Sequence, residues 1–207
     1  FSQHTAATGR LASSNPTLQN IPIRSENGKL IRKAFIRTPG NLLLTADYSQ
    51  VELRLLAHFS NDQTMVTAFN NNVDIHAQTA AEVTGSPVDK ISSSERSKAK
   101  AVNFGLMYGQ SSFGLSKALK ISRSEAKEYI TNYFRRFSKV KSYLDELKEI
   151  AEDKGYSETY HGRKRFLPDI KSNNRTIKSQ AERVAVNSPI QGTAADIIKL
   201  AMINIDK

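Results

Sequence analysis

Four side chains with two kinds of chemistry recur at every fourth position between residues 96 and 108. Two cations, Arg96 and Lys100, are followed by two aromatic rings, Phe104 and Tyr108. Positions four apart lie on one face of a helix, so these side chains are expected to form a single stripe. Cations bind phosphate and flat rings stack on bases, so the stripe favours a nucleotide. The alternative that spacing alone leaves open is a mixed surface helix whose rings pack on the core.

A second candidate site lies in LLLTADYSQVELRLLAHFS, residues 42–60. The apolar residues of 41–46 are expected to form a buried strand, and 51–59 a helix with apolar residues along one face. Asp47 follows the strand and Glu52 lies one turn into the helix. A carboxylate that leaves a buried strand needs a partner. It is either a helix cap or salt bridge, or a metal ligand at the carboxyl end of a strand.

The composition bounds the class of protein. A chain of 207 residues, 39% hydrophobic and 24% charged, suffices for one soluble domain or two small lobes that share a core. No apolar run approaches the roughly 20 residues that span a bilayer, and the first residues show no signal peptide. The absence of cysteine excludes disulfides and thiolate metal sites and fits a cytoplasmic location.

The charge indicates a polyanionic partner. The chain carries a net charge of +10, and the segment 161–183 holds seven basic residues against two acidic ones. Such a stripe favours nucleic acid first and a membrane surface second. The start at Phe1 and the end within an apolar-periodic helix lead us to expect a piece of a longer chain.

The local patterns predict a mostly helical chain after a polar, turn-rich start. Residues 29–36 and 41–48 are predicted to form a β-hairpin around RTPG, and 155–167 a second hairpin. Gly105 inside a predicted helix hints at close approach by another group. Helices are predicted over 50–60, 62–70, 74–84, 93–108, 122–137 and 140–154, with a last one over 173–207 that is broken or kinked near Pro189 and Gly192; capping boxes, Ser92 with Glu95 and Ser122 with Glu125, open two of them.

Several of these stretches together resemble a known family. DYSQVELRLLAHFS, RSKAKAVNFGLMYG and AERVAVNSPIQGTAADIIKLAM resemble, in that order, three signatures of family A DNA polymerases, the DNA polymerase I type; TGRLASSNPTLQNIPIR (8–24) and VDIHAQTAAEV (73–83) also match. The resemblance covers nearly the whole chain. It implies an α+β fold, with a mostly helical fingers subdomain attached to part of a small antiparallel palm sheet. The expected parts are palm over 1–60, fingers over 61–170 and helices returning to the palm over 171–207.

The resemblance also implies a metal-dependent catalytic centre. Asp47 resembles the first of two aspartates that hold a pair of Mg²⁺ ions, with the carbonyl of Tyr48 as a further ligand. The motif that bears the second aspartate is absent from the chain. Lys100 is expected to bind the triphosphate and is a candidate to protonate the pyrophosphate leaving group. Without the second aspartate, the isolated chain is expected to be inactive.

The remaining implied sites bind the nucleotide and the DNA. Glu52 is expected beside C2′ of the incoming sugar, where it would exclude a ribose 2′-OH. The set implied for nucleotide binding is Arg96, Lys100, Phe104, Tyr108, His76, Glu52 and Gln50. The set implied for the minor groove of primer–template DNA is Arg10, Gln19, Asn20, Arg183, Asn187 and Gln191, whose donors suit the acceptors that all correct base pairs share.

The leading hypothesis is therefore a template-directed DNA polymerase of replication or repair. Its expected partners are primer–template DNA and deoxynucleoside triphosphates, with no membrane, and a monomer is expected. One alternative is a single-subunit RNA polymerase, against which Glu52 argues because such an enzyme must admit the 2′-OH. The other is a non-catalytic DNA-binding module, against which the presence of Asp47, Arg96 and Lys100 argues.

Overall fold

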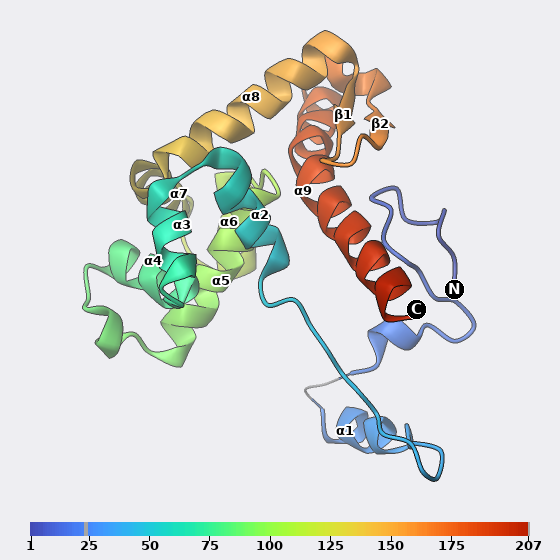
Figure 1. The fold of residues 1–207 in the computed structure, drawn as a ribbon. Helices are drawn as coiled ribbons and strands as arrows, with labels where there is room; N and C mark the ends of the chain where they lie inside the picture. The colour runs from blue at the N-terminus through green and yellow to red at the C-terminus, as the bar shows by residue number, and fades with distance from the viewer. Residues whose placement is uncertain (23–24, 207) are drawn as a thin grey trace. The chain divides into compact units, whose positions relative to one another are not determined.

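The structure is a computed structural model that describes residues 1–22 and 25–206. The described chain divides into two compact units, residues 1–49 and 50–207. It is mostly helical, and the described residues contain one two-stranded antiparallel sheet (Figure 1). This confirms the predicted α+β class. The predicted division into palm and fingers at residues 60 and 170 stays a prediction.

The first unit begins with a loop that is stabilised by hydrogen bonds between its own polar groups. Ser2 and Ala12 form an isolated antiparallel bridge, and the Gln19 amide donates to the carbonyl of Leu11 at 2.7 Å. Residues 18–20 form a 3₁₀ helix. Residues 23–24, which end the resemblance quoted over 8–24, lie outside the described part.

The hairpin predicted over 29–48 is wrong. Helix α1 spans Glu26–Lys33, where Ser25 caps the N-terminus by accepting from the N–H of Gly28 at 3.1 Å. The acidic Glu26 in the first turn suits the helix dipole. No strand forms over 41–48, and Leu42 and Leu44 are 89% and 87% exposed. A strand needs a neighbour that pairs its backbone and covers its side chains, and the described chain supplies none here.

The second unit contains the other helices and the sheet. Short helices follow one another with their own caps; Asp62, Asp74, Ser92, Ser111 and Ser122 each accept backbone N–H bonds at a helix start. Both predicted capping boxes, at Ser92 and Ser122, are confirmed. The helices before the sheet are α2 (Val51–Ser60), α3 (Gln63–Asn70), α4 (Ile75–Thr84), α5 (Ser93–Met107), α6 (Ser112–Leu119), α7 (Arg123–Arg136) and α8 (Ser138–Lys154).

One apolar core joins these helices to the last one, α9 (Arg175–Ile205). Residues from α2 to α8 pack with Val186 and Ile190 of α9. Fully buried members of this core include Leu53, Leu56, Met65, Val102, Leu115 and Val140. A smaller cluster joins the end of α8 to α9 through Ala151, Ile170 and Ala185. Helices α2, α5 and α9 therefore share one core.

The sheet is the hairpin predicted over 155–167. Strands β1 (Tyr156–Glu158) and β2 (Lys164–Phe166) pair antiparallel, with Ser157 opposite Arg165. Figure 1 shows the hairpin beside α9. Arg163 from the turn donates to the carbonyl of Gly192 at 3.0 Å. A Cβ on Gly192 would stand 2.4 Å from Thr159 Cγ2, so glycine permits this close approach.

The break predicted near Pro189 does not occur, since α9 runs continuously from Arg175 to Ile205, and the alternative, a kink, stays a prediction; Lys207 lies outside the described residues. Proline lacks an N–H, which leaves the carbonyl four residues earlier without its helical donor. That carbonyl belongs to Ala185, and the buried hydroxyl of Ser157 in β1 donates to it at 3.0 Å. The hairpin thus supplies the donor that the proline removes.

Candidate functional site

Helix α5 carries the predicted stripe on its outer face. Arg96 and Lys100 are exposed, whereas Phe104 and Tyr108, at the end of the helix, are partly buried. The opposite face enters the core through Ala99, Val102, Asn103, Leu106 and Met107. The four-residue spacing therefore predicted the face correctly: cations lie in solvent and rings lie at the margin of the core.

Side chains from α2 and α4 meet the two rings of α5. The ring of Phe104 lies 5.9 Å from that of His76 and 6.2 Å from that of Tyr108, measured between ring centres. The Tyr108 hydroxyl donates to the carboxylate of Glu52, which is 7% exposed. The structure thus brings Glu52, His76, Phe104 and Tyr108 together, although they come from three helices.

Arg96 is oriented by a residue that the sequence did not single out. Asp74 accepts from the backbone N–H groups of His76 and Ala77 with Oδ1, which caps α4, and from Arg96 Nε with Oδ2 at 2.5 Å. Partial burial acts to raise the pKa of Asp74, but the bonds from Arg96 and from the two backbone groups hold that pKa below its usual value. Because Nε of Arg96 is occupied, its two terminal nitrogens are the groups that can face a ligand.

His76 is held in a buried polar cluster. Its side chain is 2% exposed, and Asn103 Nδ2 lies 2.9 Å from its Nδ1. Thr79 Oγ1 lies 3.1 Å from the other amide atom, Asn103 Oδ1. Burial, with smaller contributions from the positive charges of Arg96 and Lys100 and against the opposing effect of Asp74, lowers the pKa of His76 to about 4. The imidazole is therefore neutral at pH 7.

The close approach predicted at Gly105 is made by the protein itself. A Cβ there would stand 2.2 Å from Gln110 Oε1, so the side chain of Gln110 folds back over the helix end. Gly109 has a φ of +68° and packs within 3.3 Å of Arg183 Cγ, measured from its ideal Cβ position. The end of α5 thus lies against α9.

The predicted DNA-contacting residues of the second unit lie on α9. Arg183 is exposed, and Asn187 and Gln191 are partly buried. The Oδ1 atom of Asn187 is buried with no hydrogen-bond partner in the part of the chain described here. A cavity of about 450 Å³ runs along the same helix, lined by Arg175, Thr176, Ser179, Gln180 and Arg183. Guanidinium, hydroxyl and amide groups in one groove suit a phosphate backbone.

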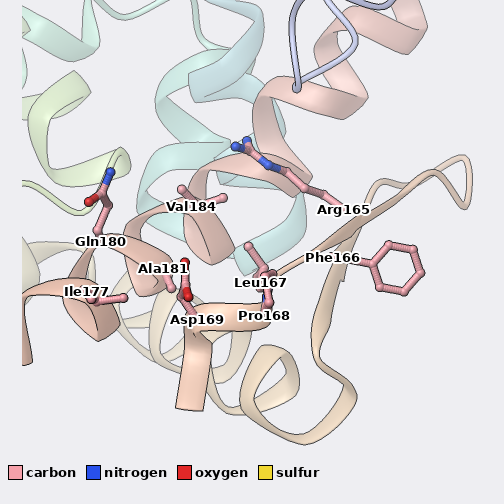
Figure 2. Close-up of a pocket in the computed structure, with 9 residues that line it drawn as sticks. All are labelled: Arg165, Phe166, Leu167, Pro168, Asp169, Ile177, Gln180, Ala181 and Val184. Carbon is pink, nitrogen blue, oxygen red and sulfur yellow. The ribbon is translucent and has the colours of Figure 1, made fainter. Parts of the chain in front are cut away.

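A second cavity lies between the hairpin and α9 and is separate from the α5 stripe. Its volume is about 360 Å³, and none of the residues that line it is a predicted site residue. Figure 2 shows Leu167 and Val184 on its walls and the ring of Phe166 pointing away from them. Its lining residues are Arg165, Phe166, Leu167, Pro168, Asp169, Ile177, Gln180, Ala181 and Val184.

The remaining predicted residues lie at or before the start of the second unit. Asp47, Tyr48, Arg10, Gln19 and Asn20 belong to residues 1–49 and are exposed. Gln19 serves its own loop, and Asp47 has no hydrogen bond or ion pair among the described residues. No cluster of three or more His, Cys, Asp or Glu side chains suited to a metal ion occurs within 1–22 and 25–206.

Gln50 occupies the N-cap position of α2 in a strained conformation, without a side-chain capping bond. Its φ of 54° lies in the left-handed region, and its Oε1 is buried without a partner in the described structure. Such strain in a residue other than glycine or asparagine is often found at functional sites.

Sequence reasoning missed Asp74, Thr79 and Asn103. Asp74 has the signal of a helix cap, but its bond to Arg96 spans 22 residues of sequence. Asn103 offered one clue, because it is a polar residue on the face of α5 that otherwise enters the core. A buried amide is expected to have partners, yet the sequence does not identify them.

Comparison with known proteins gives matches over the whole chain. Residues 1–207 match the sequence profile described as DNA polymerase family A. The chain is 57% identical to DNA polymerase I of Caldicellulosiruptor bescii over 205 residues, which cover 99% of this chain and 24% of that protein. It is 54% identical to DNA polymerase I of Streptococcus pneumoniae R6 over 209 residues, 100% of this chain and 24% of that one. It spans about a quarter of the length of these relatives.

A solved structure shares the fold as well. It is described as the POL domain of Pol1 from M. smegmatis in complex with DNA primer-template and dNTP. The TM-score is 0.92 at 47% sequence identity, and the match covers 100% of this chain and 36% of that chain.

Among the described residues, every helix is too short or too polar to span a membrane.

Proposed function

Because this chain belongs to DNA polymerase family A, we propose that it forms the nucleotide-binding helices of a template-directed DNA polymerase, together with part of its DNA-binding surface. The observation that carries the proposal is the face of α5, where two exposed cations lead to two partly buried rings. The solved relative, described with primer-template and dNTP, supports both partners.

In this proposal the cationic end of α5 binds the triphosphate. Arg96 offers its terminal nitrogens as a fork, since Asp74 holds its Nε, and Lys100 adds a mobile charge one turn further on. His76 contributes a neutral N–H donor from α4. Lys100 can also donate a proton to the departing pyrophosphate, because an ammonium group near the leaving oxygens acts as a general acid.

The aromatic end of α5 binds the base and the sugar. Phe104 and Tyr108 offer ring faces for stacking, which is tolerant of base identity because every base has a π-face. Glu52 lies at this end, buried and bonded to the Tyr108 hydroxyl. A carboxylate held in this way cannot move aside readily, so it would occupy the space that a ribose 2′-OH needs.

The proposed DNA surface includes one face of α9. Arg183, Asn187 and Gln191 recur at four-residue spacing on this helix, and donors of these types suit the minor-groove acceptors that all correct pairs share. The groove lined by arginine, hydroxyl and amide groups along the same helix supports a polyanionic ligand here. For the first unit, a separate proposal is that Arg10, Gln19 and Asn20 contact DNA.

The proposed chemistry uses a divalent cation, and Mg²⁺ fits the donors that the chain offers. Asp47 presents an exposed carboxylate with no partner in the described residues, and Tyr48 a backbone carbonyl. Both are hard oxygen donors, and Mg²⁺ in such enzymes is held by few carboxylates plus substrate phosphates. When bound, the ion would neutralise charge on the reacting phosphates. One carboxylate is an incomplete set, so the isolated chain is expected to be inactive.

A chimera tests the proposal. We would replace the matching segment of the C. bescii polymerase, which is 57% identical, with this chain, and measure single-nucleotide incorporation on a primer–template. Lys100→Ala is expected to lower kcat/KM by about 10²-fold, the usual loss for one preorganised electrostatic contact. Lys98→Ala is the matched control, because Lys98 is an exposed lysine on the same helix but off the stripe.

The control should retain the kinetics of the chimera. Equal activity of the two lysine variants would contradict the proposal for α5. Ribonucleotide incorporation as fast as that of deoxynucleotides would favour an RNA polymerase, and DNA binding by the chimera without any turnover would favour a non-catalytic module. Primer extension by the isolated 207-residue chain would contradict the prediction that this chain alone is inactive.

A further inference from the structure

We propose that Asn103 is a positioning residue for nucleotide binding: its side-chain amide fixes the imidazole of His76 as the tautomer that carries its proton on Nε2. The proposal rests on the proposed function, in which His76 contacts the triphosphate. Asn103 lies on the core face of α5, away from the stripe of Arg96 and Phe104, so it acts through His76 and not on the ligand.

The contact between the two side chains is buried. His76 is 2% exposed and Asn103 is 1% exposed, and 2.9 Å separate His76 Nδ1 from Asn103 Nδ2. An amide nitrogen can only donate, so Nδ1 must accept, and the single proton of a neutral imidazole then resides on Nε2. A donor bond in such a dry site is worth more than it is in water.

Thr79 anchors the amide in this orientation. Its hydroxyl lies 3.1 Å from Asn103 Oδ1 and 2.8 Å from the carbonyl of Ile75, and it can donate to either oxygen. Thr79 is itself 1% exposed. The structure places Asn103 Oδ1 toward the Thr79 hydroxyl and Nδ2 toward His76. The chain of hydrogen bonds therefore runs from Thr79 on α4 to Asn103 on α5 and back to His76 on α4.

The tautomer matters because a phosphate oxygen can only accept. A histidine with its proton on Nδ1 would present the Nε2 lone pair to the phosphate, which is repulsive. The charged groups around His76 are Asp74 on its own helix and Arg96 and Lys100 on α5. Since His76 stays neutral between pH 6 and pH 8, the choice of tautomer decides whether it can donate.

Nitrogen-15 NMR of the chain itself tests the tautomer without any nucleotide. The chain has four histidines, and the resonances that disappear in His76→Gln identify His76. Long-range couplings should show an unprotonated Nδ1 and a protonated Nε2 from pH 5.5 to pH 8. A protonated Nδ1, or an even mixture of tautomers, would overturn the role of Asn103.

Two substitutions ask whether Asn103 is responsible. Asn103→Asp replaces the donor by an acceptor, so the proton should move to Nδ1 and the pKa of His76 should rise. Thr79→Val removes the hydroxyl anchor with little change in shape and should yield a mixture of tautomers. Either variant with the wild-type tautomer and pKa would overturn the proposal, and thermal unfolding reports whether each variant folds.

Kinetics in the chimera then separates positioning from mere packing. The nucleotide KM of the parent should be flat between pH 6 and pH 8. In Asn103→Asp, KM at pH 8 should exceed KM at pH 6 by about tenfold, the value of one hydrogen bond to a charged group, because only protonated His76 can then donate through Nε2. A loss that is equal at both pH values would indicate a structural role and overturn the proposal.

The double variant His76→Gln/Asn103→Asp should lose this pH dependence, because the titrating ring is gone. If it keeps the dependence, His76 does not mediate the effect and the proposal is wrong. The expected tautomer combined with a KM that is indifferent to His76→Gln would instead refute the proposed contact of His76 with the triphosphate. The two failures are therefore distinguishable.

Discussion

Asp74 links the start of α4 to the guanidinium of Arg96: one carboxylate oxygen caps the helix that carries His76, and the other accepts from Arg96 Nε at 2.5 Å. Two of the three groups proposed to bind triphosphate are thus positioned by one side chain. Arg96 bonds to Asp74 through Nε, which leaves its terminal nitrogens available for a phosphate.

The first prediction separates these two tasks of Asp74. Asp74→Asn should keep the cap, because asparagine caps helices about as well as aspartate, whereas Asp74→Ala should lose about 1 kcal/mol of folding free energy. Both should raise the nucleotide KM of the chimera, since both release Arg96. Urea unfolding and KM measurements check the two effects. An unchanged KM in Asp74→Ala would show that Arg96 needs no orientation.

The same residue gives a prediction on pH. The pKa of Asp74 is lower in the folded chain than its usual value, so its ionised form stabilises the fold at neutral pH, and this stabilisation is lost as the pH falls through the folded-state pKa. Between pH 7 and pH 3, the wild type should therefore lose more folding free energy than Asp74→Asn. Other carboxylates titrate in both proteins and cancel in the difference. Parallel losses would contradict the pKa direction.

Local signals predicted most of the helices, and long-range partners account for the errors. The capping boxes at Ser92 and Ser122 satisfy backbone groups within a few residues, so the sequence contains everything that is needed to place those helix starts. Leu42–Leu44 have the composition of a buried strand, but pairing and burial depend on other strands. The donor to the Ala185 carbonyl in α9 is Ser157, which lies 28 residues earlier in the chain.

The candidate site shows the same division. The α5 stripe was predictable because Arg96, Lys100, Phe104 and Tyr108 lie on one helix with a known period. The bonds from Tyr108 to Glu52 and from Asn103 to His76 span 56 and 27 residues. No local pattern encodes such pairs. They arise only when the packing of α2, α4 and α5 is known.

The third prediction concerns Ser157 and Pro189. Ser157→Ala should leave the buried carbonyl of Ala185 without a donor and lower the folding free energy by about 1–3 kcal/mol. In a Pro189→Ala background the same change should cost less, because alanine restores a backbone N–H that can bond to that carbonyl. Chemical unfolding of the four proteins completes the cycle. Additive losses would show that the hydroxyl does not compensate for the proline.

The fourth prediction concerns Asp62, which stabilises two helix starts at once. Its Oδ1 accepts from Thr64 and Met65 in α3, and its Oδ2 accepts from the N–H of Lys139 at 3.3 Å, at the start of α8. Helix α8 has no side-chain cap of its own at Phe137. Asp62→Ala should thus lose more than the roughly 1 kcal/mol of a single cap.

Ser111→Ala sets the reference for this loss, because it removes one ordinary cap, that of α6. Urea unfolding of both variants supplies the comparison. Equal losses of folding free energy would contradict the double role of Asp62.

The last prediction concerns Glu52 and discriminates best between DNA and RNA synthesis. Its carboxylate is buried and accepts a hydrogen bond from the Tyr108 hydroxyl, which holds it in place. If it excludes the 2′-OH, Glu52→Ala in the chimera should raise kcat/KM for ribonucleotides by about 10²-fold or more, the range in which a pocket discriminates a single hydroxyl. Incorporation of deoxynucleotides should fall only modestly, because removing a steric barrier leaves the right substrate nearly as good.

Tyr108→Phe should give an intermediate effect, since it removes the hydroxyl bond to Glu52 but keeps the carboxylate itself. Glu128→Ala is the control, because Glu128 is an exposed glutamate on α7, and it should change the incorporation of neither substrate. Matched ribo- and deoxynucleotides on one primer–template supply the measurement. If both substrates slowed equally in Glu52→Ala, Glu52 would serve the structure of the site and not its selectivity. A gain in kcat/KM for ribonucleotides alone, larger in Glu52→Ala than in Tyr108→Phe, would show that the bond from Tyr108 helps Glu52 to exclude the 2′-OH.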